Sequence, residues 1–133
     1  MDATDENLSD ALPTQSDPGA MEAAQAWMQR ATAVSSVYGC GVRLADRSIL
    51  ASSRDENLPN PNLQSAVRDT LEVVHLLRRD QISAEQLCWT FEHGQILCVS
   101  VASGAAAVLL VSIDQGDAAA IDALLSEFLS AGF

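Results

Sequence analysis

Hydrophobic residues recur at helical spacing in three segments of the chain, which predicts three helices. Their stripes consist of Met21, Ala24, Trp27, Met28 and Ala31; of Leu63, Ala66, Val67, Thr70, Leu71, Val74 and Leu77; and of Ile121, Leu124, Leu125, Phe128 and Leu129. The expected starts are Asp17-Pro18, Asn62, and either Asp114 or Asp117, because these residue types commonly cap or begin helices. We expect the second helix to end at about Arg79 and the third near Gly132.

The second helix carries more apolar residues than one buried face needs. Val73 and Leu76 fall outside its main stripe and widen it. Two interpretations fit this excess: a deep position in the core of one chain, or contact with a helix of a second subunit. We favour the second subunit, because the strand pattern described below also calls for a partner.

Patterns of period two predict five strands. The first begins at Val37 and places Tyr38, Cys40, Val42 and Leu44 on one face, with Gly39, Gly41 and Arg43 on the other. A tight turn at residues 45–48 leads to a short second strand at residues 49–52, and residues 53–61 form a connecting loop that contains two prolines. Residues 106–113 are almost continuously apolar, as expected for a central strand with both faces buried.

The strands Gln86–Phe91 and 95–101 flank a hairpin that we centre on His93-Gly94. This register puts Cys88 and Cys98 on opposite faces, so these two residues cannot form a disulfide. Both faces of the hairpin are largely apolar, which calls for helices on both sides of the sheet. The pattern predicts an α/β (α+β) fold of three layers, in the order α-β-β-α-β-β-β-α.

The chain has 133 residues with 18 acidic and seven basic side chains, all arginine, and a formal charge of −11. This field disfavours nucleic acid and anionic membrane surfaces, and no segment approaches the roughly 20 apolar residues of a membrane span. We therefore expect no nucleic-acid partner, no membrane insertion and a cytoplasmic location. Residues 1–20 contain five acids and no base, so we expect a disordered acidic tail before a single domain at residues 21–133.

No arrangement of residues predicts catalysis, a cofactor or a metal site. The chain lacks the lysine that a phosphate-binding loop requires, and Gly39-Cys40-Gly41 lies within a strand rather than between a strand and a helix. The two histidines lack the neighbours of a zinc motif. The three cysteines show no C-x-x-C spacing, so we expect buried, reduced thiols. We expect a protein without enzymatic activity and without a cofactor.

The turn between the first two strands is similar to that of a known family. The run Gly41-Val42-Arg43-Leu44-Ala45-Asp46-Arg47-Ser48-Ile49-Leu50-Ala51-Ser52-Ser53 resembles the hydrophobic run, aspartate turn and following Ala-Ser of the roadblock family, named for the dynein light chains. The resemblance covers residues 21–133, although Ser48 stands where the family commonly has glycine. It implies a profilin-like, five-stranded antiparallel sheet ordered two-one-five-four-three, with the second helix on one face and the other two helices on the other.

In that order the strand Gln86–Phe91 lies at an edge and has no lysine, proline or charge to block pairing. We expect a homodimer in which two copies of this strand pair antiparallel across a two-fold axis and bring the second helices together. The expected dimer interface consists of Leu87, Cys88, Trp89, Thr90, Phe91, Val73 and Leu76.

Members of the roadblock family act by binding, and they include bacterial regulators of Ras-like GTPases. The resemblance implies a non-enzymatic, homodimeric regulatory or scaffold protein that binds a Ras-like small GTPase and modulates its nucleotide cycle. We expect the partner to contact the second helix at Arg68, Glu72, His75 and Arg79. Two alternatives stay open: an acidic, dimeric chaperone of the type III secretion kind that holds an effector protein, and a small-molecule sensor of profilin-like shape.

Overall fold

The computed structural model describes residues 18–80, 86–92, 94–112, 117–131 and 133. Its helices are α2 (Pro18–Thr32), α3 (Asn60–Arg79) and α4 (Ala118–Ser130), and its strands are β1 (Val37–Arg43), β2 (Ile49–Ser53), β3 (Gln86–Phe91), β4 (Gly94–Ser100) and β5 (Ala106–Ser112). Of the tail expected at residues 1–20, residues 1–17 lie outside the described residues. Residues 18–20 form the first turn of α2, in agreement with the helix start expected at Pro18.

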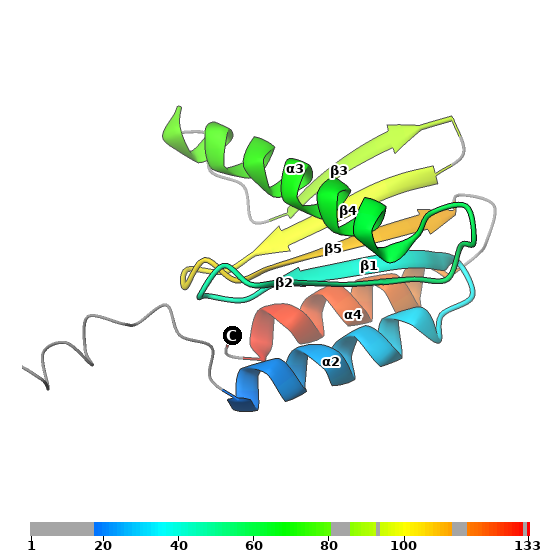
Figure 1. The fold of residues 1–133 in the computed structure, drawn as a ribbon, viewed down its shortest axis with the longest axis horizontal. Helices are drawn as coiled ribbons and strands as arrows, with labels where there is room; N and C mark the ends of the chain where they lie inside the picture. The colour runs from blue at the N-terminus through cyan, green and yellow to red at the C-terminus, as the bar shows by residue number, and fades with distance from the viewer. Residues whose placement is uncertain (1–17, 81–85, 93, 113–116, 132) are drawn as a thin grey trace, which may run out of the picture.

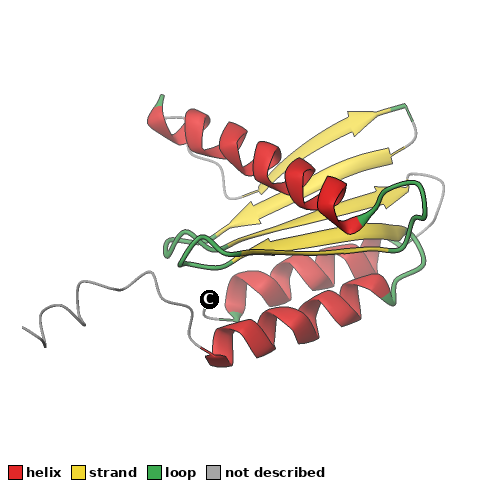
Figure 2. Cartoon of the chain, viewed as in Figure 1, coloured by secondary structure: helices red, strands yellow, loops and turns green. Residues whose placement is uncertain are grey.

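The strands form one antiparallel sheet in the order β2-β1-β5-β4-β3. Helix α3 covers one face, and α2 and α4 cover the other (Figure 1 and Figure 2). β5 lies at the centre, and its apolar residues are buried. The predicted fold class, strand order and three layers are confirmed.

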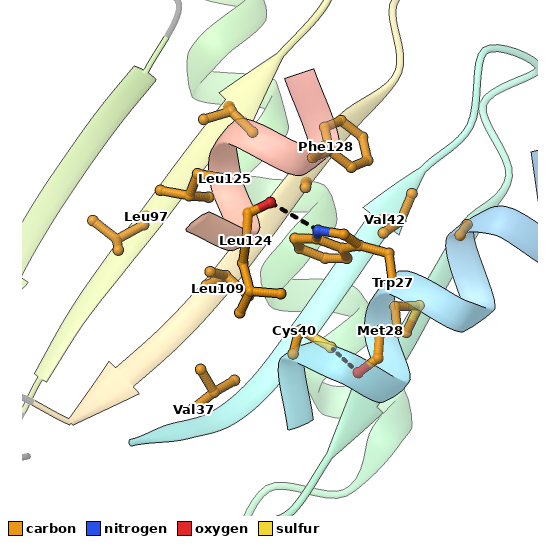
Figure 3. Close-up of a cluster of buried hydrophobic side chains, with 14 of the residues drawn as sticks. Trp27, Met28, Val37, Cys40, Val42, Leu97, Leu109, Leu124, Leu125 and Phe128 are labelled. Atoms are coloured by element: carbon orange, nitrogen blue, oxygen red, sulfur yellow. Dashed lines mark hydrogen bonds between the residues drawn. The ribbon is translucent and has the colours of Figure 1, made fainter. Parts of the chain in front are cut away.

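One half of the core lies between the sheet and the helices α2 and α4. Trp27 of α2 is buried, and its indole Nε1 donates a hydrogen bond of 2.9 Å to the carbonyl oxygen of Leu124 in α4 (Figure 3). The indole also meets the ring of Phe128 edge to face, with centroids 5.4 Å apart. These contacts hold together two helices that are far apart in the sequence.

The other half of the core lies under α3. Leu63, Val67, Leu71 and Val74 are buried there, as the stripe predicts. The helix comes closest to β1 at Gly41, where an added Cβ would lie 2.5 Å from Val67 Cγ2. The glycines of β1 therefore allow close packing of a helix, which is the role expected of glycine within a strand.

The start of α3 differs from the prediction. The helix begins at Asn60, with Pro59 as its N-cap, rather than after Asn62. Pro61 fits in the first turn because N–H groups there have no acceptor within the helix, so proline loses nothing. Residues 60 and 61, expected in the connecting loop, therefore begin the helix.

The hairpin between β3 and β4 also differs in detail. Phe91 pairs with Gly94, so the register predicted around His93-Gly94 is wrong by two residues; His93 itself lies outside the described residues. A shift of two keeps each side chain on its predicted face, and Cys88 and Cys98 do lie on opposite faces. The glycine serves a close approach rather than the turn, because a Cβ at Gly94 would lie 2.5 Å from a carbonyl oxygen of β5.

β1 contains a bulge, where its pairing with β5 shifts register between Val37 and Gly39. Tyr38 packs with the cluster under α3, whereas Cys40 packs with the cluster under α2. The prediction that Tyr38 and Cys40 share a face is wrong, because a bulge adds an unpaired residue and so reverses the alternation of side chains.

The aspartate turn between β1 and β2 forms as predicted. The backbone N–H of Ser48 donates to Asp46 Oδ1 at 2.8 Å, and the N–H of Leu44 donates to the carbonyl oxygen of Ser48 at 2.9 Å. The residue in the left-handed region is Arg47, with φ of 78°. Ser48 has no positive φ, so the departure from glycine at this position does not prevent the turn.

Gly41→Ala should destabilise the protein, because the new methyl group would overlap Val67 and push α3 away from β1. We expect the free energy of unfolding, measured in urea, to fall by about 1–3 kcal/mol. Gly39→Ala is the matched control, since its nearest neighbour is the flexible side chain of Leu63 at 3.3 Å, and its loss should be smaller. Equal losses at the two positions would contradict this account of the contact.

Candidate interaction surface

Side chains of α3 occupy the outer edge of β2. Gln64 Nε2 donates to the carbonyl oxygen of Ile49 at 2.8 Å, at the start of the strand. Asn60 Oδ1 accepts from the backbone N–H of Ser53 at 2.9 Å, at its end. Two main-chain groups that an incoming strand would need are therefore already bonded, which makes β2 a poor edge for pairing.

The opposite edge of the sheet, at β3, is open as far as the described residues show. Within the described part of the chain, no side chain forms a hydrogen bond with a main-chain group of β3. The strand also carries no charged residue. The edge position predicted for Gln86–Phe91 is confirmed, and its outer row of N–H and C=O groups is available to another strand.

The side of β3 that faces α3 is apolar and only partly covered. Leu87 and Trp89 pack against the cluster under α3, and Phe91 is 42% exposed. Cys88 and Thr90 point to the other face of the sheet and are exposed. β3 is only partly covered because α3 packs mainly against β2 and β1.

Two further apolar side chains are exposed on α3 itself. Val73 is 41% exposed and Leu76 is 38% exposed. A deep position in the core of their own chain is therefore excluded. Together with Leu87, Trp89 and Phe91, they form what we call the apolar edge.

Arg68, Glu72, His75 and Arg79 are all exposed and lie in one row along α3, which we call the polar ridge. Spacings of four, three and four residues keep the row on one side of a helix. Gln64 lies on the same side, where it reaches β2. The structure thus brings the four expected partner-binding residues together on the β2 side of α3.

Two more arginines meet where α3 ends above the sheet. Arg43 on β1 donates from Nε and Nη2 to the carbonyl oxygen of Gly104, at 3.2 and 3.0 Å. Arg78 on α3 donates to Ser100 Oγ at 2.5 Å. Arg43 and Ser100 both pair with Ala106 of β5, so they lie in one row across the end of the sheet.

Arg47, in the turn after β1, completes what we call the arginine cluster: Arg43, Arg47 and Arg78. Burial lowers the pKa of the Arg43 guanidinium, and the charges of Arg47 and Arg78 lower it further. The periodicity of the sequence does not predict that these three arginines lie close together. One signal in the sequence was usable: Arg78 stands four residues after the buried Val74, so it lies on the side of α3 that faces the sheet, although Arg78 itself is exposed.

Comparison with known proteins identifies the architecture. The sequence matches no protein-family model and no curated protein. Among solved structures, Myxococcus xanthus MglB superposes with a TM-score of 0.62 at 7% identity, over 88% of this chain and 92% of that one. A Roadblock/LC7 domain from Streptomyces avermitilis gives a TM-score of 0.55 at 9% identity, over 76% and 90%. The chain has the roadblock fold. At these identities the likeness concerns the fold alone.

The cysteines of this roadblock fold differ in exposure. Cys40 and Cys98 are buried, and burial raises the pKa of each thiol to about 12. Cys88 is exposed, so the prediction of three buried thiols is wrong for this residue. The reason is that Cys88 lies on the uncovered face of an edge strand.

A pocket of about 340 Å³ lies on the face of the sheet that α2 and α4 cover, beside the start of α4. Its lining is mixed: apolar residues of β4, β5 and α4 are joined by polar residues that include Gln86, Gln95, Asp117 and Asp122. Asp117 accepts hydrogen bonds from the backbone N–H of Ser36 at 3.1 Å and from Ser35 Oγ at 3.2 Å. These hydrogen bonds from Ser36 and Ser35 lower the pKa of Asp117. They also connect the segment before β1 to the start of α4. No sequence pattern predicts this pocket.

The part of the chain that the structure describes offers neither a metal site nor a membrane-spanning helix. Among the residues that the structure describes, no group of three or more His, Cys, Asp or Glu residues could hold a metal ion. None of the described helices is both long enough and apolar enough to cross a membrane.

Cys88 should be the one thiol that a maleimide modifies in the native protein at pH 8. Mass spectrometry should show one adduct per chain, because Cys40 and Cys98 are buried and stay protonated. Denaturation should expose all three thiols, and native Cys88→Ser should give no adduct. Two or more adducts on the native wild-type chain would contradict the burial described here.

Proposed function

We propose that this chain is a non-enzymatic regulatory protein that forms a homodimer and binds a Ras-like small GTPase. The observation that carries the proposal is the difference between the two sheet edges. β2 is hydrogen-bonded by α3, whereas β3 is open and lies beside the apolar edge. The roadblock fold supports the proposal, because the family that the β1–β2 turn resembles includes bacterial regulators of such GTPases.

In the proposed dimer, the two β3 strands pair antiparallel across a two-fold axis, and the sheet continues through both chains. Pairing supplies partners for the open N–H and C=O groups of β3. The apolar edge supplies the driving force, since burying the exposed parts of Val73, Leu76 and Phe91 removes apolar surface from water. The two α3 helices then lie next to each other.

The paired helices present two copies of the polar ridge, and we place the GTPase there. Arg68, Glu72, His75 and Arg79 offer charges of both signs and hydrogen-bond donors at exposed positions, which suits a polar protein contact. The chain has no phosphate-binding loop of its own, so the nucleotide chemistry belongs to the partner. This protein acts on that chemistry by contact with the switch loops of the GTPase.

The wild-type chain should behave as a dimer, with twice the chain mass of 14.1 kDa, in size-exclusion chromatography with light scattering. Val73→Asp combined with Leu76→Asp should give a monomer, because the dimer would bury unpaired carboxylates. Leu129→Asp is the matched control. This exposed leucine lies on α4, on the opposite side of the sheet, and its replacement should leave the dimer intact.

A cross-link should locate the contact at β3. A short bis-maleimide should join two wild-type chains through Cys88, and it should fail to join Cys88→Ser chains. The proposed interface is excluded if the wild-type chain is a monomer at tens of micromolar, or if Leu129→Asp disrupts the dimer as strongly as the double variant does.

Binding of the GTPase can be measured by calorimetry with Ras-like GTPases from the same organism, each in its GDP-bound and GTP-bound states. At least one should bind, and in one nucleotide state better than in the other. Arg68→Glu combined with Arg79→Glu should weaken binding by roughly ten-fold or more, because two charges of the polar ridge are reversed. Arg30→Gln, on α2, should bind like wild type. If no GTPase binds in either state while an extended effector segment does, the chaperone alternative replaces this proposal.

A further inference from the structure

The arginines of this acidic chain are gathered on one side of the molecule. Five of the seven lie on α3, on β1 or in the turn after β1: Arg43, Arg47, Arg68, Arg78 and Arg79. The remaining two lie on α2 and after β2, where each is bonded to neighbouring groups. A chain with a formal charge of −11 thus keeps a local concentration of positive charge.

The arginine cluster has hydrogen bonds, but no carboxylate of the described residues is bound to it. Arg43 and Arg78 donate to the uncharged oxygens of Gly104 and Ser100. Within residues 18–80, 86–92, 94–112, 117–131 and 133, none of the three arginines forms an ion pair. The charges of Arg47 and Arg78 act against that of Arg43, and Glu72 offsets them only in part. Such a group of like charges attracts a ligand with several negative groups.

The first 17 residues of the chain carry the complementary charge. They contain five acids and no basic residue: Asp2, Asp5, Glu6, Asp10 and Asp17. Acids spaced along a segment of this kind can place several carboxylates near neighbouring guanidinium groups, and the arginine–carboxylate pair is a strong hydrogen-bonding combination.

The attachment point of these residues lies at the correct end of the molecule. Figure 1 shows that α2 begins at the same end of the sheet as the β1–β2 turn, the β4–β5 turn and the last turn of α3. Arg43 ends β1, Arg47 lies in the β1–β2 turn and Arg78 lies in the last turn of α3, while the β4–β5 turn supplies the carbonyl oxygen of Gly104 that Arg43 binds. A segment of 17 residues reaches at most about 55–60 Å when extended, which is ample for passing from the α2 side of the sheet to the α3 side.

We propose that residues 1–17 dock on the arginine cluster of their own chain, with their carboxylates against Arg43, Arg47 and Arg78. Because the segment is tethered, its effective concentration at the cluster is on the order of millimolar, so individually weak contacts are sufficient. These contacts lie at the surface and weaken as salt is added. The docked segment covers the surface beside the polar ridge. It would therefore compete with a GTPase for that surface, and this one consequence rests on the proposed function.

A spin label near the N-terminus tests the docking in the full-length protein. Leu8→Cys in a Cys88→Ser background provides one reactive thiol, since Cys40 and Cys98 are buried. At about 20 mM salt we expect the amide resonances of residues 45–48 and of the last turn of α3 to lose about half of their intensity or more through paramagnetic relaxation. The intensity should recover at about 500 mM salt, where surface ion pairs are screened.

Three variants of the labelled chain serve as controls, with circular dichroism to show that each folds like wild type. Arg47→Gln combined with Arg78→Gln should abolish the loss of intensity, whereas Arg30→Gln, which also removes an arginine, should retain it. Replacement of the four acids among the first ten residues by their amides should act like the cluster variant: Asp2→Asn, Asp5→Asn, Glu6→Gln and Asp10→Asn.

The docking is overturned if the weakened resonances lie on α2 and α4, if they stay weak at high salt, or if the cluster variant leaves them weak. It is also overturned if the segment docks on another chain. In that case a spin-labelled chain would weaken the resonances of a second, isotope-labelled chain, while the resonances of the spin-labelled chain itself would keep their intensity. The experiment contains no GTPase. A failure would therefore leave the proposed function standing, and a failure of GTPase binding would leave the docking standing.

Discussion

Helix α3 can lie directly on β1 because Gly41 has no side chain to hold Val67 away. From that position over β1 and β2, the first turns of the helix bring Asn60 and Gln64 to the outer edge of β2, where both form hydrogen bonds. The same position leaves β3 only partly covered. This packing therefore makes β2 the poorer edge for a further strand and leaves β3 the better one.

The position of α3 also decides how charge is distributed. Arg78, four residues after the last buried residue of the helix, reaches the end of the sheet at Ser100, in the row that also holds Arg43. Carboxylates elsewhere have partners of their own: Asp117 is hydrogen-bonded at the start of β1, and Glu127 pairs with an arginine of α2. Arginines on the exposed side of α3 and at its end are thus left without carboxylate partners among the described residues, and their positive charge attracts acidic groups.

Much of this architecture could be predicted because the spacing of apolar residues reflects directly which faces are buried. The helices, the strands and the layers followed from that spacing, and the strand order followed from the roadblock resemblance. Tyr38 and Gly94 could not be placed correctly, because a bulge and a nearby carbonyl oxygen depend on tertiary contacts. The start of α3 at Asn60 was missed although the rule that admits proline in a first turn is local. The exposure of Val73 was predictable, since it lies off the stripe. The arginine cluster was not, because the register of β1 with β5 assembles it.

A TM-score of 0.62 to MglB at 7% identity shows how few side chains the roadblock fold requires. A helix stripe, small residues beneath α3 and an aspartate turn can be supplied by many sequences, so a shared fold does not carry a shared partner. The open strand is different, because β3 lies at an edge in any sheet of this order. The proposed dimer therefore depends on the architecture, whereas the choice of partner depends on the polar ridge and the arginine cluster, whose side chains the fold leaves free to vary.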